Sequence, residues 1–486
     1  MVKTYPIFKL YLQNETLEFR EHDIISATVT QEINPLSLEV PSAKLDISIY
    51  TTNPDFNPFS SGRYYQSLTA NIKADLFEYA GDQEIYIGQF YLQEWDNPSE
   101  GVLTFTLQDA LGVMQNIPFD GTFYENSTSL TDIVKDIAIY APTEISLDTD
   151  IANLELKGYI PGNINLREAL QQICFAVGAY AETKGTDHIL LKPIQLPNAH
   201  AVLQGFYYDN IYSTYDGDAV YSDFIIDGTI TNLQKTNKQE LKILPMVTDI
   251  ELITHDYVKS ATKETIFNDT LEPGDYKIVF PKPYGGVSLW GAGDVPEALG
   301  TEDGVTVLIT EAGGAYPDVT ILGKTGTYQS GSNTISLHIT TTGSVLIEGY
   351  PYEDNMQSIG WKNPDSIQTY NAGALYDDAA AIYDLSTYWR EWSILAPQNI
   401  WKVTEGTLVN RAIGSTVLDR LIQYANARHQ QTITALTEKE VQPGLLYQVD
   451  SLYGKKLIAT VELVISKLSD GYLKEVRLTG VEKLEA

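Results

Sequence analysis

Residues 85–111 read IYIGQFYLQEWDNPSEGVLTFTLQDAL, and this stretch decides the fold of the first part of the chain. Apolar and polar residues alternate on both sides of DNPS at 96–99, and Asp, Asn, Pro and Ser are the residues that turns prefer. The pattern predicts two antiparallel strands joined by a tight turn at 96–99, with Gly88, Phe90 and Trp95 in the first strand. The stretch contains no catalytic signature.

The composition favours β structure. The chain has 486 residues, of which 43% are hydrophobic, and it contains 32 Tyr against 4 Met and 1 Cys. This length suits roughly two to four domains with sizeable cores. Tyrosine combines an apolar ring with a polar hydroxyl, so it suits half-buried sheet faces and wet interfaces. The tyrosines therefore indicate sheets, protein interfaces, or both.

The charge of the chain excludes several partner classes. The net charge is −32, from 64 acidic and 32 basic residues. Specific binding to nucleic acid needs clusters of Lys and Arg, and adhesion to an anionic membrane needs the same. Two interpretations of the negative charge remain open: simple solubility, or an acidic wall past which DNA slides without adhering.

Neither a secretion signal nor a membrane segment is predicted. Lys9 interrupts the apolar run of MVKTYPIFKLYLQ, and no small-residue cleavage site follows it. No stretch reaches the about 20 apolar residues of a membrane span, so no stable membrane insertion is expected. The one cysteine, Cys174, lies in an apolar helical stretch and is expected to be a buried structural thiol. Folding in a reducing cytoplasm is compatible with this cysteine content.

The first 203 residues divide into two predicted units. Residues 1–117 alternate with period two and are predicted to form an antiparallel β-barrel or sandwich. Residues 118–203 are predicted to form a small α/β unit with two helices and short strands. Ser129 is the predicted cap of the first helix, and Asn165 begins a predicted capping box for the second, which should end at Gly178.

The rest of the chain divides into three predicted parts. Residues 204–262 and 410–486 are predicted to form a second β-barrel, with a helix at 410–428. Residues 263–352 are rich in Gly, Thr and Pro, which predicts an inserted small β-sandwich. Residues 353–409 are predicted to connect these parts and to be partly helical.

The sequence lacks the motifs of common enzymes and metal sites. It contains no Gly-x-Ser-x-Gly elbow and no His-Glu-x-x-His pair, and its six histidines are scattered singly. The glycines at 291–293 are not followed by the Lys-Ser/Thr of a phosphate loop, and the acidic loops at 148–155 and 215–220 lack EF-hand spacing. No enzyme activity, cofactor or metal site is therefore predicted. Paired carboxylates of a glycoside hydrolase depend on spatial separation, so sequence leaves them open.

Three ordered stretches share a recognisable pattern. The first is the hairpin at 85–111, which reads G-x-F … W … V-x-F … D. The second is NINLREALQQICFAVGAYAETKGTDHILLKPI at 163–194. The third runs from YANAR at 424–428 through VQPGLLYQVD to the hairpin ending at 482. In this order they resemble the baseplate hub family of tailed bacteriophages and related contractile injection particles (tailocins). The Gly-rich insert at 263–352 resembles that of hubs from Gram-positive hosts.

The resemblance implies a mainly β fold: tail-tube-like antiparallel β-barrels, a small α/β domain and an inserted β-sandwich. It implies a structural protein of the virion tail baseplate, assembled in the cytoplasm of the bacterial host. The expected form is a homotrimeric ring that adapts a six-fold tail tube to a three-fold spike or fibre. The implied partners are a tail tube or distal tail protein above, a spike or fibre protein below, and a tape-measure protein or DNA in the channel. Because the sequence stops at Ala486, a fused cell-wall hydrolase is not expected.

Two alternative functions stay open. The insert could be a host-glycan-binding module, for which Trp290 and Tyr284 are candidate platforms. Trp389 and Trp392, in the stretch YWREW, could form a sugar platform, a packed helix end or a subunit contact. The second alternative is a cell-wall hydrolase with unrecognised carboxylates. Glycan capture by the excised insert and hydrolysis of peptidoglycan distinguish these alternatives from a hub.

Overall fold

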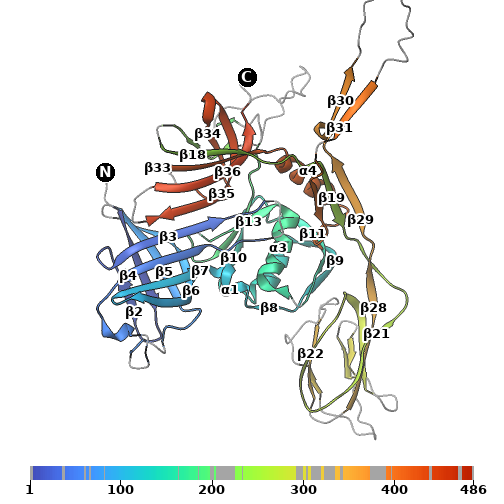
Figure 1. Cartoon of the computed structure of the whole chain (residues 1–486). Helices are drawn as coiled ribbons and strands as arrows, with labels where there is room; N and C mark the ends of the chain where they lie inside the picture. Colours follow the sequence, from blue (N-terminus) through green and yellow to red (C-terminus); the bar gives the residue numbers. More distant parts are fainter. Residues whose placement is uncertain are drawn as a thin grey trace, which may run out of the picture.

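The computed structural model of this chain consists mostly of strands, with four α-helices among the residues that it describes (Figure 1). Those residues are 4–35, 39–57, 59, 62–64, 67–80, 83–162, 164–183, 185–197, 202–203, 225–232, 234–291, 299–302, 305–307, 319–321, 334–339, 343–372, 390–395, 397–436, 441–468 and 473–483. The predicted fold class is confirmed: the chain is mainly β, largely antiparallel, with a small α/β region.

One sheet of 13 described strands contains both the N-terminal and the C-terminal strands of the chain. Its N-terminal half has the order β2-β1-β5-β6-β7-β4-β3, and its C-terminal half continues as β35-β36-β33-β18, with β34 and β17 beside β35. The bounds in the N-terminal half are β1 Thr4–Tyr11, β2 Thr16–Phe19, β3 Ile24–Glu32, β4 Lys44–Tyr50, β5 Lys73–Ala80, β6 Gln83–Ser99 and β7 Val102–Gln108. Those in the C-terminal half are β17 Gly228–Ile230, β18 Lys235–Ile243, β33 His429–Leu436, β34 Leu446–Asp450, β35 Lys456–Lys467 and β36 Leu473–Glu482.

The two halves meet through backbone pairing, with β3 antiparallel to β35 from the Thr28–Lys467 pair to the Glu32–Leu463 pair. Each half has its own apolar cluster. In the N-terminal half, alternate residues of β4 such as Leu45 and Ile47 are fully buried. Period-two burial of this kind is what a sheet with one covered face requires. The halves are therefore joined by backbone pairing while each keeps its own apolar cluster.

The turn in the 85–111 hairpin lies later than predicted. Strand β6 continues through DNPS to Ser99, and Ser99 pairs with Val102, so Glu100 and Gly101 form the turn. Gly101 has a φ of 80°, a left-handed conformation that glycine adopts without steric cost. The prediction failed because irregular pairing between Asp96 and Ser99 accommodates the proline near the strand end.

The α/β region follows the first hairpin and has the predicted helix caps. The Ser129 side chain accepts a hydrogen bond from the Asp132 backbone, Asn165 and Glu168 form a capping box, and Gly178 ends α3 with a φ of 74°. The helices are α1 Ala110–Met114, α2 Leu130–Ala138 and α3 Leu166–Val177. The strands are β8 Pro118–Phe119, β9 Thr122–Ser129, β10 Ile145–Leu147, β11 Glu155–Ile160, β12 Ile164–Asn165, β13 Ala179–Glu182 and β14 Ile189–Pro193.

The helix predicted at 410–428 is present as α4, Gly414–Ala425. It packs on the α/β region rather than inside the second half of the sheet. Val417 and Leu421 belong to the same apolar cluster as Leu170 and Ile173 of α3. A segment that follows the insert therefore completes the core of a region that precedes it.

Three strands connect the insert to the rest of the molecule: β19 Asp249–Thr254, β29 Gln357–Lys362 and β32 Ile400–Val403. Together they form a separate sheet, in which β19 lies between the other two. The predicted assignment of residues up to 262 to the second barrel is wrong from β19 onward, because β19 and β20 (Tyr257–Lys259) pair outside the 13-stranded sheet.

The insert contains two sheets within its described residues. In Figure 1 it extends below the connecting strands, away from the main sheet. Strand β28 is the longest of its strands and also pairs with β20 at its root. The bounds are β21 Glu264–Leu271, β22 Gly274–Val279, β23 Tyr284–Gly291, β24 Leu299–Glu302, β25 Val305–Val307, β26 Val319–Ile321, β27 Thr334–Ile339 and β28 Gly343–Asp354.

The segment predicted to be partly helical differs from the prediction where it is described. Arg390–Leu395 is strand β31 and pairs with β30, Ile367–Ala372. The only helical turn in the described part of 353–409 is the short η2, Pro364–Ser366. Residues 373–389 lie outside the described residues.

The remaining described elements are short. Strand β15 (Val202–Leu203) pairs with β16 (Ile225–Ile226), and the short turns η1 (Pro54–Phe56) and η4 (Leu452–Gly454) occur in loops.

Candidate channel-lining surface

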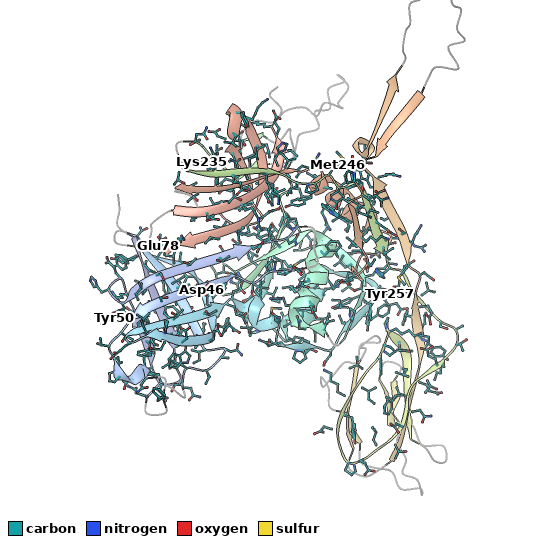
Figure 2. All side chains as sticks on the ribbon, in the orientation of Figure 1. Asp46, Tyr50, Glu78, Lys235, Met246 and Tyr257 are labelled. Carbon is teal, nitrogen blue, oxygen red and sulfur yellow. The ribbon has the colours of Figure 1, made fainter. Side chains whose placement is uncertain are left out.

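One face of the 13-stranded sheet carries mostly polar residues on seven adjacent strands, from β7 through β4, β3, β35, β36 and β33 to β18. The exception is β35, which places the half-exposed Leu463 and Ile465 beside Lys467 on this side. Directly paired residues in an antiparallel sheet point to the same side, so the register fixes the members of this face. In one row across the sheet, Thr106 pairs with Asp46, and Asp46 pairs with Thr28. Thr28 in turn pairs with Lys467, across the junction between the two halves. Figure 2 labels Asp46 in the lower half and Lys235 in the upper half of this sheet.

Short hydroxyl side chains dominate the polar face. They come from both halves of the sheet and are at least partly exposed: Ser26, Thr28, Thr30, Ser48, Thr104, Thr106, Thr432 and Thr434. The opposite sides of the same strands carry the buried apolar residues, such as Val29, Phe105 and Val464. Alternation along each strand therefore places the core on one side and a hydroxyl-rich surface on the other.

Among the described side chains of these seven strands, acids and bases on the polar face are equal in number. The acids are Glu32, Asp46, Glu240 and Glu475, and the bases are Lys44, Lys242, Lys467 and Arg477. Lys44 lies 3.0 Å from Asp46, and Arg477 forms an ion pair with Glu32. The net charge of −32 is therefore not concentrated on this face, and a polyanion would meet neither strong attraction nor strong repulsion there.

A polar network fixes the junction between the halves. Arg477 of β36 contacts Glu32 of β3 and lies 3.2 Å from a carboxylate oxygen of Glu462 in β35. Tyr424 of α4 donates its hydroxyl to Glu462, so the network also reaches the α/β region. Burial raises the pKa of Glu462, while a hydrogen bond with Thr479 and the Arg477 cation lower it. The Glu462 carboxylate, held by donors from α4 and β36, therefore fixes β35 against both of these elements.

Asp109 anchors the start of α1 beneath the sheet. It is 1% exposed and accepts hydrogen bonds from the backbone N–H groups of Ala43 (2.9 Å) and Gly112 (3.1 Å) and from the Thr183 hydroxyl (2.7 Å). Burial raises the pKa of Asp109 to about 6, although these hydrogen bonds lower it. One carboxylate thus joins β4, the first hairpin and the hairpin that follows α3. Asp109 is the final Asp of the G-x-F … W … V-x-F … D pattern at 85–111, so that position has a structural role in this chain.

Arg420 of α4 joins α4 to α3. Its guanidinium donates to the carbonyls of Phe175 (2.5 Å) and Ala176 (3.3 Å), at the C-terminal end of α3. A cation at this end of a helix is favourable because the unpaired carbonyls carry negative charge. Burial lowers the pKa of Arg420 to about 10. The guanidinium also lines a small cavity between β3, α3 and α4, which Cys174 borders.

The insert attaches to the α/β region through side chains. Phe123 of β9 contacts Tyr352 of β28, with ring centroids 4.4 Å apart, and Tyr257 packs edge-on against Phe123. Figure 2 labels Tyr257 at this root. His255 Nδ1 lies 2.6 Å from an oxygen of Asp354, which joins the two chain segments that enter and leave the insert. Aromatic packing and one buried polar pair therefore hold the root of the insert.

Of the comparisons with known proteins, the one with solved structures finds matches. No family model and no curated protein matches the chain. Among solved structures, a tail protein from Neisseria meningitidis MC58 matches with 10% identity and a TM-score of 0.48, over 98% of this chain and 96% of that one. The prophage tail protein gp18 from Listeria monocytogenes EGD-e matches with 9% identity and a TM-score of 0.45, over 98% and 95%. The 43 kDa tail protein of prophage MuSo2 from Shewanella oneidensis matches with 9% identity and a TM-score of 0.44, over 98% of this chain and 98% of that one.

These likenesses are distant, because each TM-score is below 0.5 at about one identical residue in ten. The functional conclusion below therefore depends on the residues of this chain.

Of the four aromatic residues predicted as glycan or interface positions, the structure describes Tyr284 and the backbone of Trp290 and Trp392. Tyr284 is 2% exposed, packs against Phe280 and donates its hydroxyl to Glu264, so its ring presents no face to a sugar. Trp290 lies in β23, and Trp392 lies in β31 opposite Tyr370, in a different sheet. The side chains of Trp290 and Trp392, and the whole of Trp389, lie outside the described residues.

Other predicted features have clear positions. Cys174 is buried in α3, as predicted, and burial raises the pKa of its thiol to about 12, which keeps it protonated and unreactive. The described residues contain no group of three or more His, Cys, Asp or Glu side chains placed to hold a metal ion. Within the same residues, no helix combines the length and apolar character needed to cross a membrane.

The polar face is not among the features predicted from the sequence. Its signal is present, since Ser and Thr alternate with buried apolar residues in β3, β4 and β7. However, the face becomes continuous only because β3 pairs with a strand more than 400 residues later. Nothing local to either strand specifies that pairing.

Proposed function

We propose that this chain is a structural subunit of a phage-type tail, a baseplate hub that forms a homotrimeric ring. In this arrangement the 13-stranded sheet is one third of the ring wall, and its polar face lines the channel. The observation that carries the proposal is the continuity of that face across both halves of the chain.

The chemistry of the face supports passage rather than binding. Hydroxyl groups and paired charges give a wetted surface without a cluster of lysines or arginines that would hold phosphates. Two sheet halves per chain also give six similar wall segments in a trimer. That number matches a six-fold tail tube, while the chains themselves provide three-fold symmetry for a spike or fibre.

The proposal includes neighbours above and below the ring. A tail tube or distal tail protein would contact one end, a spike or fibre protein the other, and a tape-measure protein or DNA would occupy the channel. The proposed division of the chain keeps the units 1–117, 118–203 and 263–352, with a second wall unit formed mainly by β17, β18 and residues 429–483. The assembly would belong to the virion tail baseplate, and we propose no enzymatic role.

The molecular mass in solution tests the proposal. Light scattering of the purified chain at low micromolar concentration should give three copies of the 54.0 kDa chain, about 160 kDa. Negative-stain images of the same sample should show a ring with a central hole. A monomer that stays monomeric in the presence of tail tube protein would contradict a hub.

A further inference from the structure

The turn between β34 and β35 presents an exposed aromatic side chain in a strained conformation. Tyr453 is 95% exposed, and its backbone is left-handed, with φ 59° and ψ 23°. This conformation costs a non-glycine residue on the order of 1 kcal/mol. Hydrogen bonds from Ser451 N to Lys455 O (2.7 Å) and from Lys455 N to Leu452 O (3.3 Å) close the turn. An ordered turn that exposes a tyrosine has the features of an anchor for another protein.

Cations surround this turn in a chain that is otherwise acidic. The lysines are Lys235, Lys455, Lys456 and Lys483. Glu482 lies 2.7 Å from Lys455 and offsets part of this charge, as does Asp450 at the start of the turn. Desolvation and the nearby ammonium of Lys456 both lower the pKa of Lys483. Crowded ammonium groups repel each other, so an acidic partner would relieve the repulsion.

The opposite end of the same sheet has the complementary character. The tip of the β6–β7 hairpin exposes three acids, Glu94, Asp96 and Glu100. Two apolar side chains beside it are also exposed, Ile25 at 52% and Tyr50 at 53%. The tip lies at the beginning of β3, whereas β35 begins beyond the far end of β3, so the two sites are at opposite ends of the strands. Figure 2 labels Tyr50 at the lower left, far from Lys235 in the upper half.

We propose that the β34–β35 turn of one copy docks on the β6–β7 tip of a second copy. In this contact Tyr453 packs against Ile25 and Tyr50, and the lysines face the three acids. Two different surfaces at opposite ends make a head-to-tail contact, which closes into a ring when the rotation between copies permits. The inference rests on the proposed ring and names the residues that hold it together.

Charge reversal and its rescue test the contact. The wild-type chain, K455E/K456E, D96K/E100K and the variant with all four changes are compared by light scattering over a concentration series at low and high salt. Each double variant should raise the apparent dissociation constant of the trimer at least about tenfold, and the four-fold variant should restore it. High salt should weaken the wild-type trimer, because exposed charges are screened.

Two controls exclude a folding defect. Lys135→Glu reverses an exposed charge on α2, far from both surfaces, and should leave the mass unchanged. Circular dichroism and thermal melting should be the same for all variants. A disulfide provides a direct measurement: Lys455→Cys with Glu100→Cys in one chain should give covalent oligomers on oxidation, whereas either cysteine alone should not, since Cys174 is buried.

The possible failures can be told apart. A trimer that all variants keep, without disulfide crosslinks, would overturn the contact and leave the ring intact. A wild-type monomer in every condition would overturn both the ring and the contact. Binding of labelled single-stranded DNA that is lost in K455E/K456E, with the trimer unchanged, would reassign the turn to nucleic acid.

Discussion

The molecule has two junctions between distant parts of the chain, and they are built differently. The halves of the main sheet meet through the backbone ladder of β3 and β35, with a side-chain network of Arg477, Glu32 and Glu462 beside it. The insert meets the α/β region through rings such as Phe123 and Tyr352 and through charged side chains. The first junction depends on strand geometry, and the second depends on particular side chains. Substitutions should therefore affect them in different ways.

The largest effect is expected in the backbone ladder. Val29→Pro in β3, a strand paired on both sides, removes a donor from the ladder and forces a clash, so it should destabilise the fold by about 3 kcal/mol or more. Urea unfolding of the soluble fraction measures the change. Thr30→Val, on the polar face of the same strand, is the matched control and should change stability by less than about 1 kcal/mol. Equal unfolding midpoints for both variants would show that the halves do not depend on β3–β35 pairing.

A side-chain truncation should open the insert without affecting the main sheet. Phe123→Ala removes the ring that packs on Tyr352 and Tyr257, which should cost about 3 kcal/mol of local stability. Tryptic cleavage at Lys259, at the root, should then accelerate about a hundredfold while the main unfolding transition stays in place. Tyr276→Phe, a small change elsewhere in the insert, should leave the cleavage rate unchanged. A lowered main transition would mean that the two junctions are coupled.

Asp109 should make the N-terminal half sensitive to pH. Its pKa is about 6 in the folded chain and 3.8 in the reference state, so the folded state binds the proton more tightly. Its contribution to stability should therefore fall as pH rises from about 4 to 7, by up to about 3 kcal/mol. Chemical unfolding of the wild type and of Asp109→Asn across this pH range isolates the effect. If the free energy of unfolding changes with pH in the same way for both proteins, Asp109 is not the cause of the pH dependence.

A smaller effect is expected where α4 caps α3. Arg420→Met keeps most of the apolar stem but removes the donors to Phe175 and Ala176, which should cost about 1–2 kcal/mol. Arg411→Ala removes an exposed arginine from the segment before α4 and should cost less than about 0.5 kcal/mol. Thermal unfolding of both variants measures which of the two loses more stability. If Arg411→Ala destabilised the chain more than Arg420→Met, the carbonyls at the end of α3 would not need the cation.

The smallest effect on stability is expected on the polar face. Asp46→Asn weakens an exposed ion pair with Lys44, so the free energy of unfolding should change by less than about 0.5 kcal/mol. If this face lines a channel, the residue matters for what passes and not for folding. Urea unfolding measures the first part of this statement. A loss well above 1 kcal/mol would give the face a structural role instead.

Local chemistry made much of the fold predictable. The caps of α2 and α3 were predicted because Ser129, Asn165 and Gly178 act on their own helices. The mainly β character was predicted from composition and alternation. The turn at 96–99 was not, because turn-forming residues can also sit in the irregular end of a long strand such as β6.

Features that depend on distant partners were not predicted. Arg390–Leu395 forms a strand because β30 lies opposite it, although its own sequence permits a helix. The packing of α4 on α3 and the polar face both need contacts between residues that are hundreds of positions apart. Alternation identifies which residues share one strand face, but it does not identify the neighbouring strand.

Strand β28 has a mechanical consequence. It runs without interruption from the insert, where it pairs with β21 and β23, to the root, where it pairs with β20. A force applied to the far end of the insert is therefore transmitted along one strand, and many ladder hydrogen bonds share the load in shear. Because Tyr352 belongs to this strand, the load along it acts on the ring contact between Tyr352 and Phe123.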